Sequence, residues 1–332
     1  MKIKTPPDVI NHLLKDKTSS LGNPVEVFAP SNIALIKYWG KRNASLNLPL
    51  TDSLSITLPH TGALTRLKVS EKKEDVIHLQ NETLPSSHPL SQKASRYFDL
   101  FRPFTHCYYE LWSESQIPIG AGLASSASGF AALAKALNEL HHWQWTLSEL
   151  SIAARLGSGS ACRSFWNGFV LWQKGVEEEG MDSHGVPLSI TWPALRIGLL
   201  TLSSEEKPLS SREGMNRTTK TSALYKAWPQ KVAEDLEALV PALEKQDFHQ
   251  AGSIVESNAL AMHGTLMGAW PPISYSKPNT IKAMHHIWKL RAEGLPLYFT
   301  QDAGPNLKLL FLEEDENRVR EEFPELKIIV PF

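Results

Sequence analysis

Apolar residues recur along this chain with two spacings, and each spacing predicts a different element. Alternating or short continuous apolar runs predict strands at 25–37, 53–58, 64–70, 76–80, 107–112, 169–173 and 195–202. Helical periodicity predicts helices at 88–100, 123–141, 146–156, 218–225, 229–245, 248–262 and 279–293. A short helix at 7–16, with proline in its first turn, precedes them. Because strands and helices interleave in both halves, we expect an α+β protein of two layers with a cleft between them.

The order of these elements also suggests where the chain divides. We expect an N-terminal extension at 1–24, a first domain at 25–190 and a second domain at 191–332. The charged, glycine-containing segment 176–185 is typical of a surface connection before the second domain. At 332 residues and 42% hydrophobic content, the chain is long enough to bury a large core, and its length fits about two domains.

Composition narrows the classes of partner. A net charge of −1 gives no electrostatic footprint for nucleic acid or for an anionic membrane, so any anionic ligand must be held by local design. The two cysteines, Cys107 and Cys162, indicate a reducing compartment and no disulfide framework. The first 17 residues are too polar for a signal peptide, and no apolar run reaches about 18 residues. We therefore expect a soluble, cytoplasmic protein without a nucleic-acid or membrane partner.

The segment 119–129, IGAGLASSASG, is the strongest local signal for chemistry. Glycine lets the backbone approach an anion closely, and the free amides at a helix start carry partial positive charge. Serine hydroxyls add donors. The segment is not a Walker A loop, because no lysine follows its last glycine, and it does not open a βαβ unit as a dinucleotide loop would. It predicts a phosphate-binding loop, with simple close packing of small residues as the alternative.

Three further strings complete the pattern: 29–41 (APSNIALIKYWGK), 158–164 (SGSACRS) and 301–306 (QDAGPN). Together with 119–129, in this order, they resemble the mevalonate diphosphate decarboxylases of the GHMP kinase superfamily, and the resemblance runs from about residue 26 to the C-terminus. It implies a first domain like domain 2 of ribosomal protein S5, a ferredoxin-like second domain, and a cleft between them that binds ATP and substrate. It also implies a homodimer.

The reaction implied by the resemblance is the ATP-dependent conversion of mevalonate 5-diphosphate to isopentenyl diphosphate, with release of ADP, phosphate and CO2. Mg²⁺ is expected with ATP, although the sequence offers no clear pair of carboxylates to bind it. Two alternatives stay open: a decarboxylase of mevalonate 5-phosphate, and a GHMP-type small-molecule kinase without decarboxylation. Such kinases commonly carry an aspartate at the place of Ala161, so the acid here has to come from Asp302. A non-catalytic ATP-binding descendant would have lost Asp302 or Arg163.

The resemblance assigns catalytic roles to three residues. Asp302 takes the proton of the tertiary hydroxyl. Because a free alkoxide would cost roughly 16 kcal/mol with an ordinary carboxylate as base, Asp302 must take it late in a loose phosphoryl transfer. Arg163 binds the substrate carboxylate, for which a planar guanidinium is suited. Lys37 positions the substrate or Asp302. The alternatives are a helix cap near Asn306 for Asp302, a buried ion pair for Arg163 and a solvated surface position for Lys37.

Binding residues follow from the same strings. We expect further substrate contacts from Asn32, Tyr38, Lys41, Ser158, Ser160, Ser211 and Arg212. We expect ATP contacts from Gly120, Gly122, Leu123, Ala124, Ser125, Ser126 and Ser128. Segment 210–215, SSREGM, resembles a mobile loop that closes over the ligands, with its glycine as a hinge. Segment 271–275, PPISY, also resembles the family, without a chemical role. The adjacent histidine pairs 141–142 and 285–286 point to different helix faces and are not expected to bind metal.

Overall fold

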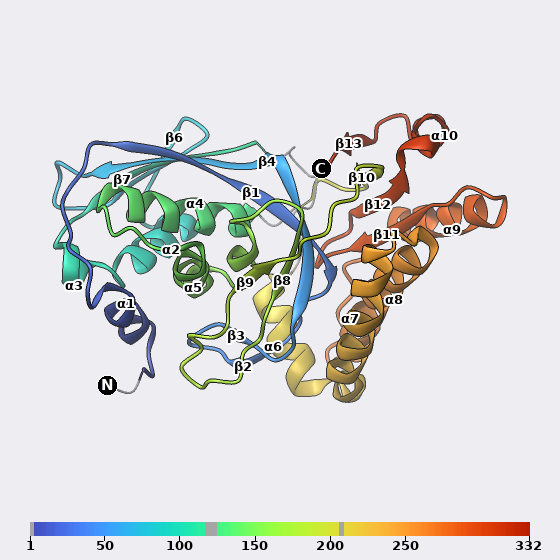
Figure 1. Cartoon of the computed structure of the whole chain (residues 1–332), viewed down its shortest axis with the longest axis horizontal. Coiled ribbons are helices and arrows are strands. Elements are labelled where there is room, and N and C mark those ends of the chain that lie inside the picture. Colours follow the sequence, from blue (N-terminus) through green and yellow to red (C-terminus); the bar gives the residue numbers. More distant parts are fainter. Residues whose placement is uncertain (1–2, 117–124, 206–208) are drawn as a thin grey trace.

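The computed structural model describes residues 3–116, 125–205 and 209–332, and these form two α+β units (Figure 1). In the first unit, a seven-stranded sheet has the order β6-β5-β7-β4-β8-β9, with β1 paired to β4. Its strands are β1 (Val25–Ile36), β4 (Ser53–Val69), β5 (Val76–Leu79), β6 (Glu82–Leu84), β7 (Tyr109–Ser115), β8 (Phe169–Trp172) and β9 (Gly185–Pro187). A small hairpin joins β2 (Lys41–Asn43) to β3 (Leu48–Pro49).

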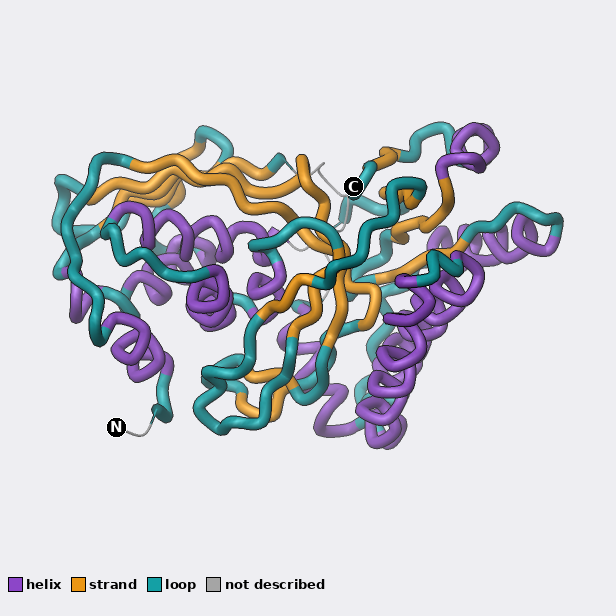
Figure 2. The backbone as a smooth tube through the Cα atoms, viewed as in Figure 1, coloured by secondary structure: helices purple, strands orange, loops and turns teal. Residues whose placement is uncertain are grey.

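Helices gather on one side of this sheet, as Figure 2 shows. They are α1 (Pro6–Leu14), α2 (Pro89–Phe98), α3 (Arg102–Thr105), α4 (Ser125–Leu140) and α5 (Leu147–Gly157), followed by the short 3-10 helix η1 (Gly159–Arg163). Helix α4 packs on β1 and β4. Its buried alanines, among them Ala131, Ala132 and Ala134, present little bulk, which suits close packing on the strands.

The second unit is an antiparallel sheet of four strands in the order β11-β12-β10-β13. These strands are β10 (Leu195–Leu200), β11 (Tyr298–Gln301), β12 (Leu307–Leu312) and β13 (Lys327–Ile329). Its helical elements are α6 (Ser211–Thr221), η2 (Ala223–Ala227), α7 (Trp228–Glu244), α8 (Phe248–Met267), α9 (Pro278–Ala292), η3 (Glu313–Asp315) and α10 (Glu316–Glu322). None of the helices within the described ranges is long and apolar enough to cross a membrane.

One hydrophobic core joins the two units. Ile33 and Ile36 of β1 and Ile56 of β4 are fully buried, and they belong to the same cluster as Leu239 of α7 and Val255 of α8. Both helices also contact β1 directly. The strand end that leads to Lys37 is therefore packed against the second unit, which fixes the two sides of the cleft relative to each other.

Some predicted elements differ from the structure, and two of the differences bear on the fold around the site. The expected strands at 53–58 and 64–70 are one strand, β4, although Pro59 and Gly62 look like strand breakers. Pairing with β1 keeps this stretch extended across a register shift between Pro30 and Ser31. Gly62 is needed there, because a Cβ would lie 2.1 Å from the carbonyl oxygen of Ala29.

The predicted helix at 218–225 is also wrong at both ends. Helix α6 begins earlier, at Ser211, because the Ser210 hydroxyl accepts a hydrogen bond from the Glu213 amide at 3.2 Å and the Glu213 carboxylate accepts from the Ser210 amide at 3.1 Å. This reciprocal capping supplies partners for amides that a helix start otherwise leaves unpaired. The helix ends at Thr221, and η2 follows as a separate turn.

The N-terminal extension packs on the first unit. Val9, Ile10, Leu13 and Leu14 of α1 are buried. The Trp145 indole donates a hydrogen bond to the Leu13 carbonyl at 3.2 Å. The chain after α1 adds backbone hydrogen bonds from Ser20 and Gly22 to the end of α4.

Candidate active site

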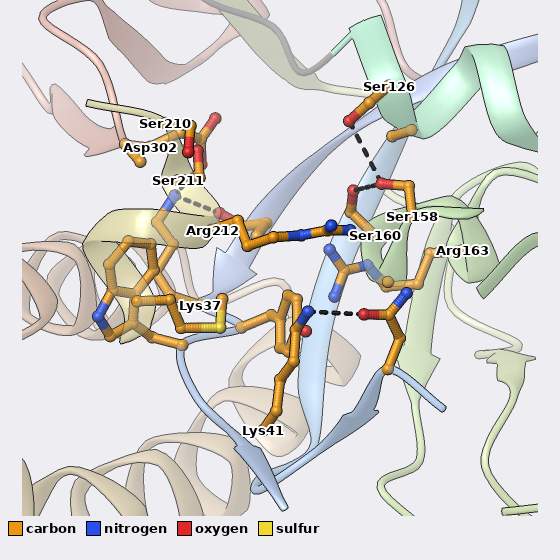
Figure 3. Close-up of a pocket in the computed structure, with 18 of the residues that line it drawn as sticks. Lys37, Lys41, Ser126, Ser158, Ser160, Arg163, Ser210, Ser211, Arg212 and Asp302 are labelled. Carbon is orange, nitrogen blue, oxygen red and sulfur yellow. Dashed lines mark hydrogen bonds and ion pairs between the residues drawn. The ribbon is translucent and has the colours of Figure 1, made fainter. Parts of the chain in front are cut away.

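A pocket of about 340 Å³ opens where the first and second units meet. Its wall includes residues from β1, α4, η1, the start of α6 and the loop after β11. Among the described residues, five cations and one carboxylate line it: Lys37, Lys41, Lys93, Arg163, Arg212 and Asp302. The pocket therefore concentrates positive charge, although the chain as a whole has a net charge of −1. Figure 3 shows all of these except Lys93 as labelled side chains around one space.

Asp302 lies at one end of the pocket, held between two lysines. Lys37 Nζ is 2.7 Å from Oδ1, and Lys308 Nζ is 3.1 Å from Oδ2. About 30% of the Asp302 side chain is exposed, whereas only 2% of Lys37 and 1% of Lys308 are. Burial alone would raise the pKa of Asp302, but the charges of Lys308 and Lys37 outweigh it and hold that pKa well below its usual range. Asp302 is therefore a carboxylate at neutral pH.

Neighbouring elements fix the backbone on both sides of this ion pair. The Lys37 amide donates to the side chain of Asn258 at 2.8 Å, and Asn258 in turn donates to Asp235 at 2.8 Å. His263 of α8 donates through Nε2 to the Asp302 carbonyl at 3.2 Å. Burial, opposed only partly by Asp302, lowers the pKa of Lys37 to about 8. The solvated-lysine alternative for Lys37 is wrong, since its side chain is almost fully covered.

The helix-cap alternative for Asp302 is also wrong. No helix starts near Asn306 in the described chain, because strand β12 begins at Leu307. The Asn306 side chain instead accepts hydrogen bonds from the amides of Leu202 and Ser203 at 2.7 and 3.0 Å. It thereby ties the loop that carries Asp302 to the end of β10.

Arg163 is a buried guanidinium without a carboxylate partner among the described residues. It donates to the Ser53 hydroxyl and, at 3.4 Å, to the Asn32 side chain, and its charge lies 5.8 Å from the centre of the Trp172 ring. Its Nε has no hydrogen-bond partner within the described part of the chain. Burial lowers the pKa of Arg163. A buried cation with spare donors facing a pocket is suited to bind an anionic group of a ligand.

A second group of cations lies along the wall formed by β2, α2 and α6. Lys41 donates to Asn47 at 2.6 Å, and Lys93 lies 4.6 Å from the centre of the Phe130 ring. Burial, together with repulsion from Arg212 and neighbouring cations, lowers the pKa of Lys41 and of Lys93 to about 8. Three cations that repel one another are stabilised by a polyanion, so this group is a candidate phosphate site.

Three of the predicted serines, Ser126, Ser158 and Ser160, lie together on the pocket wall. Ser126 and Ser158 hydroxyls are 3.2 Å apart, and Ser158 and Ser160 hydroxyls are 3.4 Å apart, so these three line the pocket as a chain. Ser128 is fully buried, accepts from Ser31 at 3.3 Å and is not among the lining residues. Residues 120, 122, 123 and 124 and the side chain of Ser125 lie outside the described part of the structure.

Asn32 and Tyr38 also line the pocket. Asn32 donates to the Ser164 hydroxyl at 2.8 Å, which directs its oxygen toward Arg163. The Tyr38 ring packs on Trp172 with 4.7 Å between ring centres. Its buried hydroxyl lacks a hydrogen-bond partner among the described residues, and burial raises its pKa. The Tyr38 hydroxyl can therefore form a hydrogen bond with a bound ligand.

The start of α6 brings Ser211 and Arg212 to the pocket, and this segment is helical where a loop was expected. Gly214 lies inside α6, where a Cβ would be 2.6 Å from the Tyr275 hydroxyl. That hydroxyl is 3.2 Å from the Leu209 carbonyl and 3.3 Å from the Ser210 carbonyl. The glycine thus permits close packing, and Tyr275 of the PPISY segment anchors the first turn of α6.

Sequence reasoning missed two cations of the site. Lys93 is one polar position of an amphipathic helix, where a lysine is ordinary and carries no signal. Lys308 offered a signal, because it interrupts the apolar run LKLLFL of β12, where an unpaired charge is unfavourable. No group of three or more His, Cys, Asp or Glu that could hold a metal is found within the described ranges.

Comparison with known proteins places this site in a family. Residues 29–185 match the model described as the diphosphomevalonate decarboxylase-like N-terminal domain. Residues 197–326 match the mevalonate 5-diphosphate decarboxylase C-terminal domain. Diphosphomevalonate decarboxylase mvd1 of Aspergillus fumigatus is 36% identical over 313 residues, covering 88% of this chain and 77% of its own.

Solved structures agree. A structure described as MDDEF in complex with MVAPP, AMPPCP and magnesium has a TM-score of 0.87 and 37% identity, covering 92% of this chain and 96% of its own. Mevalonate diphosphate decarboxylase from Staphylococcus aureus has a TM-score of 0.86 and 34% identity, covering 93% of this chain and 96% of its own. These likenesses confirm the two-domain GHMP kinase fold expected from the sequence. The chain therefore belongs to the diphosphomevalonate decarboxylase family.

Proposed function

We propose that this protein catalyses the ATP-dependent decarboxylation of mevalonate 5-diphosphate to isopentenyl diphosphate, with release of ADP, phosphate and CO2. The observation that carries the proposal is the meeting of Asp302 and Arg163 in one pocket with a group of three further cations. The relatives named for this activity and the structure described with MVAPP and AMPPCP support it. The charge and burial of each pocket residue indicate which part of the reaction it serves.

Substrate binding uses two separate sets of cations. The diphosphate suits Lys41, Lys93 and Arg212, whose mutual repulsion it would relieve. The carboxylate suits Arg163, which has no carboxylate partner of its own among the described residues. With its two ends fixed, the substrate presents its tertiary hydroxyl between them, toward Asp302. Holding the reacting group in this way lowers the entropic part of the barrier.

Asp302 acts as the proton acceptor of the first step. Its low pKa makes it a weak base, so it orients the hydroxyl and takes the proton only as the oxygen bonds to the γ-phosphorus and the bond to ADP breaks. In the free protein the ammonium of Lys37 lies 2.7 Å from Oδ1 of Asp302 and lines the pocket, so it can turn toward the transferred phosphoryl group and stabilise the negative charge on its oxygens.

Decarboxylation follows from the departure of the new phosphate. The carbon–oxygen bond breaks, cationic character develops at carbon, and the bond to the carboxylate supplies the electron pair of the new double bond as CO2 leaves. Because its pKa is low, Asp302 passes the accepted proton on to a more basic phosphate oxygen, and its restored negative charge would then favour that cation. Arg163 holds the carboxylate through hydrogen bonds without neutralising it by proton transfer, since a guanidinium stays protonated.

ATP and Mg²⁺ would be held at the part of the pocket wall that Ser126, Ser158 and Ser160 line. The serine chain of Ser126, Ser158 and Ser160 offers neutral oxygens and hydroxyl donors there. Asp302 already pairs with two lysines, and the described residues hold no cluster of metal ligands, so we assign Mg²⁺ to the phosphates of ATP, with serine hydroxyls as protein ligands. The ion would neutralise charge that develops on those phosphates. The first turn of α6 would exclude water.

A direct assay tests the proposal. Purified protein with ATP and Mg²⁺ is given mevalonate, its 5-phosphate or its 5-diphosphate in parallel, and ADP and CO2 are measured. Equal amounts of both from the diphosphate alone support the proposal. Release of ADP without CO2 from any of them would make the protein a kinase, and CO2 from the 5-phosphate alone would change its substrate. A homodimer and a cytoplasmic location are further proposals, tested by light scattering and by cell fractionation.

A further inference from the structure

A fully buried lysine lies behind the active site, outside the set of residues that line the pocket. Lys308 is in strand β12 and is 1% exposed. Its neighbours on the strand, Leu307 and Leu309, are fully buried core residues. In the sheet it pairs with Thr300 of β11 and with Leu199 of β10. A charge in such a place persists only when a partner of opposite charge offsets its loss of hydration.

The carboxylate partner of Lys308 is Asp302. The distance from Lys308 Nζ to Asp302 Oδ2 is 3.1 Å, and the other carboxylate oxygen contacts Lys37. The two lysines differ in their access to ligands, because Lys37 lines the pocket and Lys308 does not. A phosphoryl group that enters the pocket can therefore compete for Lys37, whereas Lys308 keeps its contact with Asp302 throughout.

We propose that Lys308 is a positioning residue of the reaction, which fixes Asp302 through Oδ2 and leaves Oδ1 to face the substrate hydroxyl. This inference rests on the proposed role of Asp302. The permanent partner keeps the carboxylate ionised and oriented while Lys37 turns toward the transferred phosphate. Lys308 thus acts only through Asp302 and touches no reacting atom.

Kinetics of two variants test this role. Lys308→Met keeps the length of the side chain and removes its charge, and Lys308→Arg restores the charge. We expect Lys308→Met to lower kcat at least tenfold with KM for ATP changed less than twofold, and Lys308→Arg to recover part of the loss. The matched control is Lys327→Met, an exposed position in the same sheet, for which we expect wild-type kcat.

The pH profile separates positioning from a general structural effect. The charged or titratable groups around Asp302 are Lys37 from β1, Lys308 from β12, Arg163 from η1 and His263 from α8. Loss of the Lys308 charge raises the pKa of Asp302, so the acid limb of kcat moves to higher pH in Lys308→Met. A kcat within twofold of wild type, or a loss of equal size at every pH, would overturn the proposal.

Thermal unfolding of the free protein gives a test that needs no turnover. Asp302→Asn leaves Lys308 without its carboxylate, so its melting temperature should fall, and adding Lys308→Met should raise it again. A double variant no more stable than Asp302→Asn would refute the pairing on which the inference depends. If instead the wild-type protein releases no CO2 from the diphosphate, the proposed function fails, and this unfolding result still decides the pairing.

Discussion

Replacing Arg163 with methionine is expected to remove the activity of this protein without reducing its stability. In the free protein, the buried guanidinium has only neutral partners among the described residues, Ser53 and Asn32, and one of its nitrogens makes no hydrogen bond. Exchange of such a charge for an apolar side chain of similar length is often neutral or stabilising. We expect the free energy of unfolding to rise by about 1 kcal/mol.

The effect on catalysis follows from the contacts that Arg163 would make. A guanidinium that holds a carboxylate through two charge-assisted hydrogen bonds contributes about 1.5–3 kcal/mol for each. Loss of both raises the barrier for kcat/KM by about 3–6 kcal/mol, which corresponds to a fall of roughly 10² to 10⁴. The stabilisation that the substrate gives to the wild-type protein in thermal unfolding should shrink in parallel.

A second buried arginine provides the control. Arg155 is fully buried but donates to three backbone carbonyls, those of Leu46, Gly180 and Ser183. Arg155→Met leaves these acceptors unpaired and should lower the free energy of unfolding by about 3 kcal/mol or more. Urea unfolding of both variants, with and without substrate, measures the contrast.

Either of two results would refute the reasoning on Arg163. The first is a fall in the stability of the free Arg163→Met protein as large as that of Arg155→Met, which would mean that Arg163 holds the fold. The second is a kcat/KM within tenfold of wild type, which would mean that another group binds the carboxylate.

The remaining predictions concern the other groups of the pocket. Asp302→Asn should lower kcat by about 10² to 10⁴ and leave the affinity for ATP, measured by calorimetry, within twofold; retained turnover would take Asp302 out of the mechanism. Lys93→Met should weaken binding of the diphosphate about tenfold with little change in kcat, and the exposed Lys73→Met should not. Because the pKa values of Lys41 and Lys93 are lowered to about 8, both lose their charge as pH rises past 8, so the dissociation constant of the diphosphate should increase between pH 7 and pH 9; equal values at both would count against this cation group. Chelation of Mg²⁺ should stop ADP and CO2 release together, and added Mg²⁺ should restore both; ADP formation in the chelator would contradict the assignment of the ion.

Part of this site could be predicted from the sequence because its residues occur in short strings that are unusual for ordinary loops and strands. Lys37, Arg163 and Asp302 were expected together, and the structure places all three on one pocket. The start of α6 could have been found, since Ser210 and Glu213 have the spacing of a reciprocal helix cap. The string SSREGM as a whole nevertheless resembles a mobile loop, and that resemblance does not indicate a helix start.

Other features could not be predicted from local patterns. The continuity of β4 depends on its pairing with β1. The local sequence of β4 shows only a proline and a glycine near the middle of the strand, which predict a break. Lys93 acquires its place only when α2 packs beside α4, which no periodicity in α2 reveals. The course of β4 and the position of Lys93 therefore both depend on contacts between segments that are far apart in the sequence.

The docking of α1 has a consequence for any recombination of this chain with its relatives. The match to the N-terminal-domain family model begins at residue 29, so a chimera cut there would leave out α1. The face of Trp145 that α1 covers would then have to be covered by a relative's own segment, or be exposed to water. The natural module for exchange is thus α1 together with α5, two segments far apart in the sequence that share one buried surface.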